Sequence, residues 1–311
     1  MPLLQDFKRL APHLLTALTR YQQGQMPHSL LIYGPDGVGK KTLARLLCML
    51  LMCQSTAEEK PCGQCDGCVK TMHGSHSNVL YLNASSGASI KIDDMRTVLS
   101  ALGQHALEEG NRVIVIEDAG RMTPQAQNAL LKSLEEPEAG TFFILTAVSP
   151  KELLPTIRSR TNKLHIPLWD QASLIAVLEK SGFDQQKAAH LASVSAGSPG
   201  LAFQAENDQD VQNVLNVLDQ TIFSISTAGD IPQASNQLKD LRDSADMALD
   251  LLEGRLTDDL MMQKDTSKQA GIAKMLSAVA EARKYRNANV SWQSIADSLL
   301  FHALEDLHSC Q

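Results

Sequence analysis

Residues 29–43 read SLLIYGPDGVGKKTL, and this stretch decides the fold class. Ser29 to Tyr33 form an apolar run typical of a buried strand, and a helical pattern begins near Lys40. Between them, Gly34 to Lys40 match G-x-x-x-x-G-K in the strand-to-helix setting that a phosphate-binding loop requires. The glycines, Gly34, Gly37 and Gly39, let backbone N–H groups face a phosphate, while the helix N-terminus and Lys40 add positive charge. The stretch predicts descent from a nucleotide-binding fold.

Lys41 occupies the position where this motif ordinarily has Ser or Thr, whose hydroxyl holds Mg²⁺ beside the phosphates. A lysine has no acceptor lone pair and cannot ligate a cation. Thr42 follows, but one residue turns a helix by about 100°, so its hydroxyl should point elsewhere. The loop is therefore either a relic kept for packing or a loop that still binds ATP or ADP. Mg²⁺-dependent hydrolysis is not expected.

Four more short apolar runs predict strands: Val79 to Leu82, Val113 to Ile116, Thr141 to Ala147 and Lys163 to Ile166. Helical patterns lie between them, over Lys40 to Met52 and Asp93 to Gln104. Thr123 and Pro124 open a third helix as its N-cap and first residue. Near-continuous apolar strands that alternate with helices predict an α/β domain with a largely parallel sheet.

The strand predicted at Val113 to Ile116 ends in two acids, Glu117 and Asp118. Ligands of open parallel sheets lie beyond the carboxyl ends of the strands, where acids hold metal and orient water. ATP-hydrolysing relatives of such folds usually have Asp before Glu, and this chain has the reverse order. Residual metal binding and a solvated acidic strand end are both consistent with the pattern.

Strand-like runs stop after Ile166. Residues 167–203 are predicted to form a small helical unit that ends near the Gly/Pro-rich stretch SAGSPG (Ser195 to Gly200). Residues 204–311 are predicted to be wholly helical. We therefore place the α/β core at residues 1–166, with boundaries near 166 and 204.

The composition favours a cytoplasmic protein whose partners are other proteins. The 311 residues include 28 Lys and Arg against 35 Asp and Glu, a net charge of −7, and only 4% are aromatic. DNA affinity comes largely from phosphate neutralisation, so these values disfavour an independent DNA-binding protein or a base-stacking platform. The longest apolar run, Leu46 to Cys53, is too short for a bilayer, which needs about 20 residues. We expect no membrane association, and we find no secretion signal.

Four cysteines follow the spacing C-x₈-C-x₂-C-x₂-C: Cys53, Cys62, Cys65 and Cys68. In a reducing cytoplasm this spacing predicts one tetrahedral, structural zinc in a module of residues 53–68, with tight turns at Gly63 and Gly67. Inert buried thiols and a redox C-x-x-C are the alternatives. Cys48 is expected in the core. His73 and His76 could compete as ligands, but four cysteines already complete the shell.

Arg158 and Arg160 lie in the stretch LLPTIRSRT (Leu153 to Thr161), after the fourth strand. An arginine on a rigid edge can complete a neighbouring subunit's nucleotide site as an arginine finger. On physical grounds alone, two arginines near a helix end more often cap carbonyl groups or face water.

Five stretches occur in an order that resembles the delta-prime family of bacterial DNA polymerase III clamp-loader subunits, which are AAA+ proteins. They are GPDGVGK, the four-cysteine insert, NALLKSLEEP (Asn128 to Pro137), TIRSRT (Thr156 to Thr161) and SAGSPG. The resemblance spans residues 5–201. It implies an AAA+ (RecA-like) parallel-sheet core with a structural zinc insert, a small helical lid at 167–203, and an all-α collar at 204–311 that joins subunits.

The resemblance also implies roles for single residues. Arg160 matches the arginine of the family's Ser-Arg-Cys motif, which reaches into a neighbour's ATP site, although Thr161 replaces the cysteine. The family's zinc ligands map onto the four cysteines. Its nucleotide-binding positions map onto a degenerate set: Gly34, Gly37, Gly39, Lys40, Lys41, Thr42, Glu117 and Asp118.

Four departures distinguish this chain from the ATP-hydrolysing gamma/tau-type motor subunits and favour a stator: Lys41, the order Glu117-Asp118, Ala147-Val148 at the sensor position, and Gly200 in the lid motif. The resemblance then implies a subunit without catalysis of its own in the DNA polymerase III holoenzyme, a nucleotidyltransferase. Its partners would be gamma/tau-type motor subunits and delta in a hetero-pentameric ring, which loads the sliding clamp onto primer-template DNA. A gamma/tau-like motor and a zinc-dependent nucleic-acid module remain as alternatives.

Overall fold

The computed structural model describes residues 3–56, 60–84, 88–102, 110–195, 197–263 and 265–308. Contacts divide the chain into two compact units, Met1–Ser181 and Gly182–Gln311. This division falls inside the segment 167–203 that the sequence assigns to a lid. The boundaries near 166 and 204 therefore stay predictions.

A five-stranded sheet forms the centre of the first unit, with the order β2-β3-β4-β1-β5 and parallel pairing throughout. The strands are β1 (Ser29–Tyr33), β2 (Val79–Leu82), β3 (Arg112–Ile116), β4 (Thr141–Ala147) and β5 (Asn162–His165). These bounds agree with the five predicted runs to within one residue at each end. The α/β core with a parallel sheet is confirmed.

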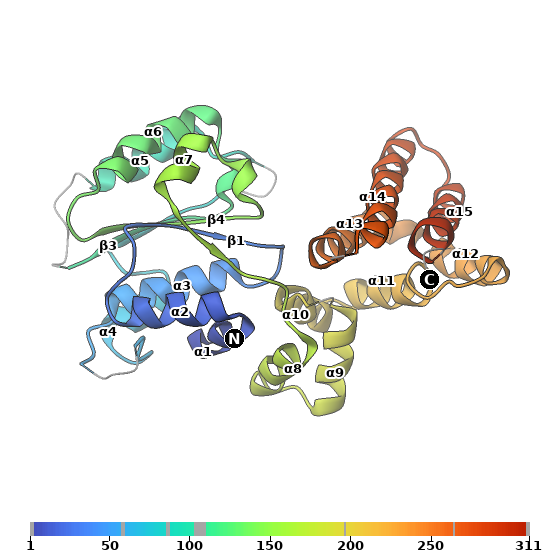
Figure 1. Ribbon diagram of the computed structural model, residues 1–311, viewed down its shortest axis with the longest axis horizontal. Coiled ribbons are helices and arrows are strands. Elements are labelled where there is room, and N and C mark those ends of the chain that lie inside the picture. The colour runs from blue at the N-terminus through green and yellow to red at the C-terminus, as the bar shows by residue number, and fades with distance from the viewer. Residues whose placement is uncertain are drawn as a thin grey trace. The chain divides into compact units, whose positions relative to one another are not determined.

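The middle strands are apolar because helices cover both faces of the sheet. In the register, Leu31 of β1 pairs with Leu145 of β4, and Phe143 of β4 pairs with Ile114 of β3. All four side chains are buried. Helices α5, α6 and α7 lie on one face, and α1, α2, α3 and α4 lie on the other (Figure 1).

The helices of the first unit follow the chain in the order of their labels. They are α1 (Leu4–Leu10), α2 (Pro12–Gln22), α3 (Lys40–Met52), α4 (Asp66–Met72), α5 (Ile92–Leu102), α6 (Pro124–Glu135), α7 (Pro155–Arg160) and α8 (Gln171–Lys180), with short 3₁₀ turns at Ala119–Arg121 and Pro150–Glu152.

The helix starts that the sequence predicted are confirmed where the structure describes them. Helix α3 has the predicted bounds. Thr123 caps α6, since its side chain accepts a hydrogen bond from the backbone N–H of Ala126, and Pro124 is the first helical residue. The predicted end of α5 at Gln104 lies outside the described residues, and the helix extends from Ile92 to Leu102.

The second unit consists of helices and turns, as predicted. Its elements are α9 (Gln185–Val194), α10 (Pro199–Asn207), α11 (Gln209–Gln220), α12 (Ile231–Lys239), α13 (Ala245–Met262), α14 (Thr266–Asn287), α15 (Trp292–His302), 3₁₀ turns at Ala228–Asp230 and Arg242–Ser244, and a π-helical segment at Ala303–His308. Its core includes Leu252, Met275 and Leu299. Within the described part of the chain, no helix combines the length and apolarity needed to cross a membrane.

Candidate functional site

The phosphate loop connects β1 to α3 and has the backbone that its glycines permit. Gly37 and Gly39 have φ angles of 76° and 96°, a region that L-residues with a side chain rarely adopt. Gly34 is required for a different reason. A Cβ added there would lie 2.2 Å from the carbonyl oxygen of Ile166, which follows β5. The loop is thus fixed both by its own turns and by the chain beside it.

The Lys40 side chain is buried inside this loop. Its Nζ donates hydrogen bonds of 2.7 Å to the carbonyl oxygens of Gly34 and Pro35 and lies 3.0 Å from Asp36 Oδ1. A cation at the centre of the loop matches the predicted position of the motif lysine. Any phosphate oxygen that enters the loop therefore meets an ammonium that already has three acceptors.

The Lys41 side chain contacts the acidic strand end. Its Nζ lies 2.9 Å from Asp118 Oδ2 and 3.3 Å from Glu117 Oε2. Partial burial alone would lower the pKa of Lys41, but the two carboxylates more than offset burial, so the pKa lies above its ordinary value. No hydrogen bond joins the neighbouring Thr42 to either acid among the described residues. The residue that replaces the Mg²⁺-binding hydroxyl thus forms ion pairs with both acids.

The acids are held in place through their backbone. The N–H of Glu117 donates to the carbonyl oxygen of Leu82 on β2. Asp118 has a left-handed backbone conformation, with φ 50° and ψ 52°, and its N–H donates to Thr146 Oγ1 at 3.0 Å. Thr146 is fully buried on β4. The sequence alone gives no signal for this threonine, because it lies within a continuous apolar strand.

Two aromatic side chains cover the outer side of the loop. Trp169 Nε1 donates to the carbonyl oxygen of Val38 at 3.0 Å, and its ring meets Phe7 edge to face, with 5.4 Å between the ring centroids. A Cβ added at Gly39 would lie 3.0 Å from the Phe7 ring. Neither aromatic residue was singled out in the sequence, which has no local signal for a contact between residues so far apart.

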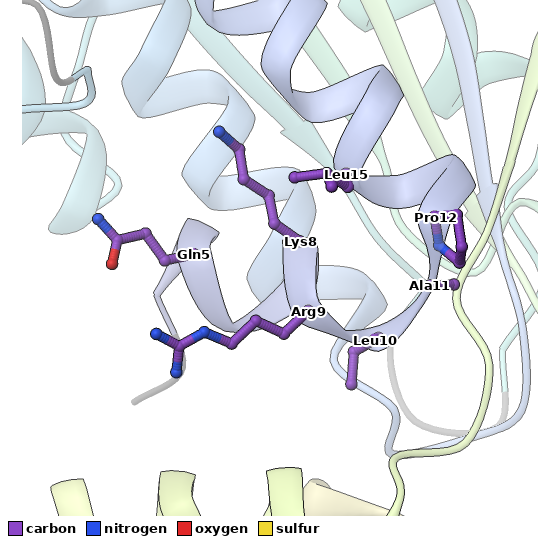
Figure 2. A pocket seen from close by; sticks show the side chains of 7 residues that line it. All are labelled: Gln5, Lys8, Arg9, Leu10, Ala11, Pro12 and Leu15. Atoms are coloured by element: carbon purple, nitrogen blue, oxygen red, sulfur yellow. The ribbon is translucent and has the colours of Figure 1, made fainter.

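A separate hollow of about 570 Å³ lies on the outer side of α1 and α2 (Figure 2). Its lining residues fall between Gln5 and Leu15 and include the basic side chains of Lys8 and Arg9. No residue of the phosphate loop lines it. The hollow is therefore not the predicted nucleotide site.

The four predicted cysteines come together between α3 and α4. The sulfur atoms of Cys53, Cys62, Cys65 and Cys68 all lie within 4.8 Å of one another. Backbone N–H groups point at three of these sulfurs: Cys62 N–H at Cys53, Cys65 N–H at Cys62, and Gln54 N–H at Cys65. Such donors stabilise thiolates, so the cluster has the geometry and the surroundings to hold a metal ion.

The thiols differ in acidity. Hydrogen bonds from the N–H groups of Gln64 and Cys65 lower the pKa of Cys62 to about 6. Burial would raise the pKa of Cys65, but the N–H groups of Cys68 and Gln54 bring it below the ordinary value. Burial raises the pKa of Cys68, and the neighbouring sulfurs add to this effect. Thiolates this close repel one another, and a bound cation would remove the repulsion.

The surroundings of the cluster confirm some expectations and correct one. Cys48 is fully buried, and burial raises its pKa to about 12, as suits a core residue. Gly63 has a φ of 72° and provides the predicted turn. Gly67 does not form a turn. It lies in α4, where a Cβ would come 2.1 Å from the carbonyl oxygen of Met52, so its role is the close packing of α4 on the end of α3.

Arg160 is the last residue of α7. Its guanidinium forms an ion pair with Glu135 at the end of α6 and donates to the Thr156 carbonyl oxygen at 3.0 Å. The side chain remains 34% exposed. Arg158 differs, because its Nε is buried and has no hydrogen-bond partner among the described residues. The sequence does not single out Glu135 as a partner of Arg160, although Glu135 lies in the motif NALLKSLEEP.

These observations define the class of protein. The strand order, the phosphate loop between β1 and α3, and the acids after β3 are those of an AAA+ nucleotide-binding core. Residues 11–169 match the family described as DNA polymerase III, delta subunit. DNA polymerase III subunit delta' of Escherichia coli (strain K12) is 34% identical over 221 residues, 69% of this chain and 66% of that protein. This chain belongs to the DNA polymerase III delta-prime family.

The chain is also similar to DNA polymerase III proteins outside the delta-prime family. DNA polymerase III subunit tau of Salmonella typhimurium is 32% identical over 243 residues, 78% of this chain and 36% of tau. A solved gamma subunit-related protein from Thermotoga maritima has a TM-score of 0.47 at 21% identity and covers 94% of this chain and 99% of its own. This chain spans less than two thirds of the delta-prime relatives it matches, 66% for Escherichia coli and 61% for Haemophilus influenzae.

Proposed function

We propose that this protein is the delta-prime stator of a cytoplasmic clamp loader. It would join gamma/tau-type motor subunits and a delta subunit in a hetero-pentameric ring that uses ATP to load the sliding clamp onto primer-template DNA. Family membership supports the assignment. The observation that carries the stator role is a contrast between the partners of two cations: Lys41 is paired with the two acids of its own nucleotide site, whereas Arg160 lies outside that site and is paired with Glu135.

The contrast separates two chemical roles. With its ammonium against Glu117 and Asp118, Lys41 leaves this chain without the hydroxyl and the free acids that Mg²⁺-dependent hydrolysis uses. Arg160 has a permanently charged, planar guanidinium that can bridge two phosphate oxygens. Its present partner is the carboxylate of Glu135, which a phosphoryl group of a neighbouring subunit can replace with the same charge-assisted geometry. The chain would thus supply an arginine to a neighbour's ATP site and would not hydrolyse ATP at its own site.

The proposal includes a structural zinc. Cys53, Cys62, Cys65 and Cys68 would hold the ion with four thiolates, and a shell closed by four protein ligands leaves no position for substrate or water. Zinc there would support the fold of the insert, and no step of clamp loading would use it.

Reconstitution with motor subunits, delta, sliding clamp and primed DNA tests the stator role. Arginine fingers contribute about 10³ to 10⁵ in rate at the one site they face. Arg160→Ala is therefore expected to lower total ATP turnover in part and clamp loading further, with normal ring assembly. Arg158→Ala is the matched control and should be milder. Loss of clamp loading with Arg158→Ala alone would assign the finger to Arg158. Full activity of both variants would show that neither arginine acts as a finger.

The alternative is a gamma/tau-like motor, which the similarity to tau keeps open. Phosphate release by the isolated chain decides between them. We expect no protein-dependent turnover. Steady turnover that disappears in Lys40→Ala would establish the motor, because Lys40 is the cation inside the phosphate loop.

A further inference from the structure

The ion pairs of Lys41 join two parts of the site that a P-loop enzyme connects through Mg²⁺. Lys41 is in the first turn of α3, directly after the phosphate loop. Glu117 and Asp118 follow β3. The Lys41 Nζ lies within 3.3 Å of both carboxylates, so one positive charge bridges the loop helix and the acidic strand end.

The residues present do not fit a divalent ion at this position. Mg²⁺ requires oxygen ligands at about 2.0–2.1 Å in octahedral geometry, usually with several waters retained. The bridging group here is an ammonium, which offers three donors and no lone pair. A divalent ion on the same carboxylates would lie within a few ångströms of a full positive charge, and that repulsion opposes binding.

The carboxylates themselves remain suitable for a cation. The backbone N–H groups of Glu117 and Asp118 donate to Leu82 and Thr146, so the backbone that carries the two acids does not depend on Lys41. Glu117 is only 13% exposed, whereas Asp118 is 38% and Lys41 50% exposed, so charge interactions at Glu117 are stronger than in bulk water. The strand end would therefore still present both acids if the lysine were removed.

We propose that the Lys41 ammonium is a resident cation that takes the position of the divalent ion, and that it alone keeps divalent metal off Glu117 and Asp118. The inference deepens the proposed loss of ATP hydrolysis. It attributes the loss of the divalent-ion site to one side chain and not to a collapsed site. One substitution, Lys41→Thr, would then restore both the missing hydroxyl and access of metal to the acids.

A titration of the zinc-loaded full chain with Mn²⁺ tests this inference. Electron paramagnetic resonance measures the concentration of free Mn²⁺ at each step. The wild type is expected to bind no Mn²⁺ at the acids. Lys41→Thr should bind one ion at least about tenfold more tightly than the weakest binding that the titration can detect, because a repelling charge is lost and an oxygen ligand is gained. Adding Glu117→Gln and Asp118→Asn to Lys41→Thr should abolish the gain. Lys163→Thr, which removes an exposed lysine on the distant strand β5, is the matched control and should behave like wild type.

Lys41→Met keeps the apolar stem and removes only the charge, so it should also admit Mn²⁺, and the test survives if the threonine variant does not fold. Wild-type binding of one Mn²⁺ that Glu117→Gln removes would overturn the inference. So would folded Lys41→Thr and Lys41→Met chains that bind no more than wild type. Because metal binding is measured on the isolated chain, its failure is distinct from a failure of the stator role, which reconstitution decides.

Discussion

Arg160 is held at the surface by contacts that it can exchange. Its ion-pair partner Glu135 is 47% exposed, and Arg160 itself is 34% exposed. Ion pairs with this exposure contribute about 0–1 kcal/mol, because water solvates both charges well when they separate. The guanidinium's other hydrogen bonds, to the Thr156 carbonyl oxygen and to Ser159 Oγ, lie within α7. An arginine in this setting can exchange its ion pair with Glu135 for one with a phosphate group without disturbing the fold.

We therefore expect weak coupling between Arg160 and Glu135. A double-mutant cycle with Arg160→Ala and Glu135→Ala, measured by urea unfolding, should give a coupling free energy of at most about 1 kcal/mol. The pair Arg255–Asp219 is the control, with side chains only 18% and 30% exposed and Arg255 also stacked 3.8 Å from the Phe223 ring centroid. That pair should couple more strongly. Coupling of about 3 kcal/mol for Arg160 would instead indicate a structural residue.

At the scale of elements, helix α4, which follows the first three cysteines of the insert, needs contacts with other elements to be stable. Helix α4 has only 7 residues, and isolated helices of that length are not stable in water. Its N-cap residue Cys65 and its residue Cys68 belong to the thiol cluster, and Gly67 packs on the end of α3. Metal binding would join α4 to α3 and supply the stability that so short a helix lacks.

Removal of zinc should therefore unfold α4 and leave the sheet intact. Elemental analysis is expected to give about one zinc per chain. Cys68→Ser should lose the metal, and hydrogen exchange should show lost protection in residues 66–72 but not in β3 or β4. Cys48→Ala, which changes a buried thiol outside the cluster, is the control and should keep the zinc. A well-folded, metal-free chain with four titratable thiols would contradict the zinc assignment.

The elements themselves were largely predictable from the sequence. Strand β4 and helix α3 have the predicted bounds because their patterns are local: a continuous apolar run in one, a glycine-rich loop followed by an apolar helix in the other. The cysteine cluster was predictable because ligand spacing is also local. Helix α10 (Pro199–Asn207) continues across the position near 204 where a boundary is predicted, so a boundary there has no local signal such as Gly or Pro, and it stays a prediction.

The contacts that complete the site could not be predicted. Thr146 holds the backbone of Asp118, Glu135 pairs with Arg160, and Trp169 binds the loop at Val38. Each contact joins residues at least 25 positions apart in the sequence. Periodicity and motif spacing describe neighbours along the chain, so they carry no information on such pairs. The role of Gly67 was predicted wrongly for the same reason, since its close neighbour Met52 lies on another helix.

At the scale of the whole molecule, the proposed stator needs a surface that binds its ring partners and an arginine that serves one of them. The arginine belongs to the first unit, and we propose that the helices at 204–311 form the collar. If so, damage confined to those helices should prevent assembly while the first unit keeps its zinc. Two glycines in these helices allow such damage to be separated from an innocuous change.

Gly271→Ala is expected to disrupt the second unit. A Cβ at Gly271 of α14 would lie 2.0 Å from the Asp306 carbonyl oxygen. This oxygen is a backbone atom, so it can move away only if the chain around Asp306 shifts. We expect a loss of about 2–4 kcal/mol of stability. Gly254 in α13 has open space where its Cβ would lie, so Gly254→Ala should gain up to about 1 kcal/mol from helix propensity.

Urea unfolding and size-exclusion chromatography of the reconstituted complex measure both effects together. Gly254→Ala should enter the ring normally. Gly271→Ala should retain about one zinc per chain but fail to join the motor subunits and delta, because helices that no longer pack against the segment Ala303–His308 cannot present a fixed surface. Normal ring assembly by a Gly271→Ala chain whose second unit is demonstrably destabilised would assign the ring contacts to the first unit and remove the collar from residues 204–311.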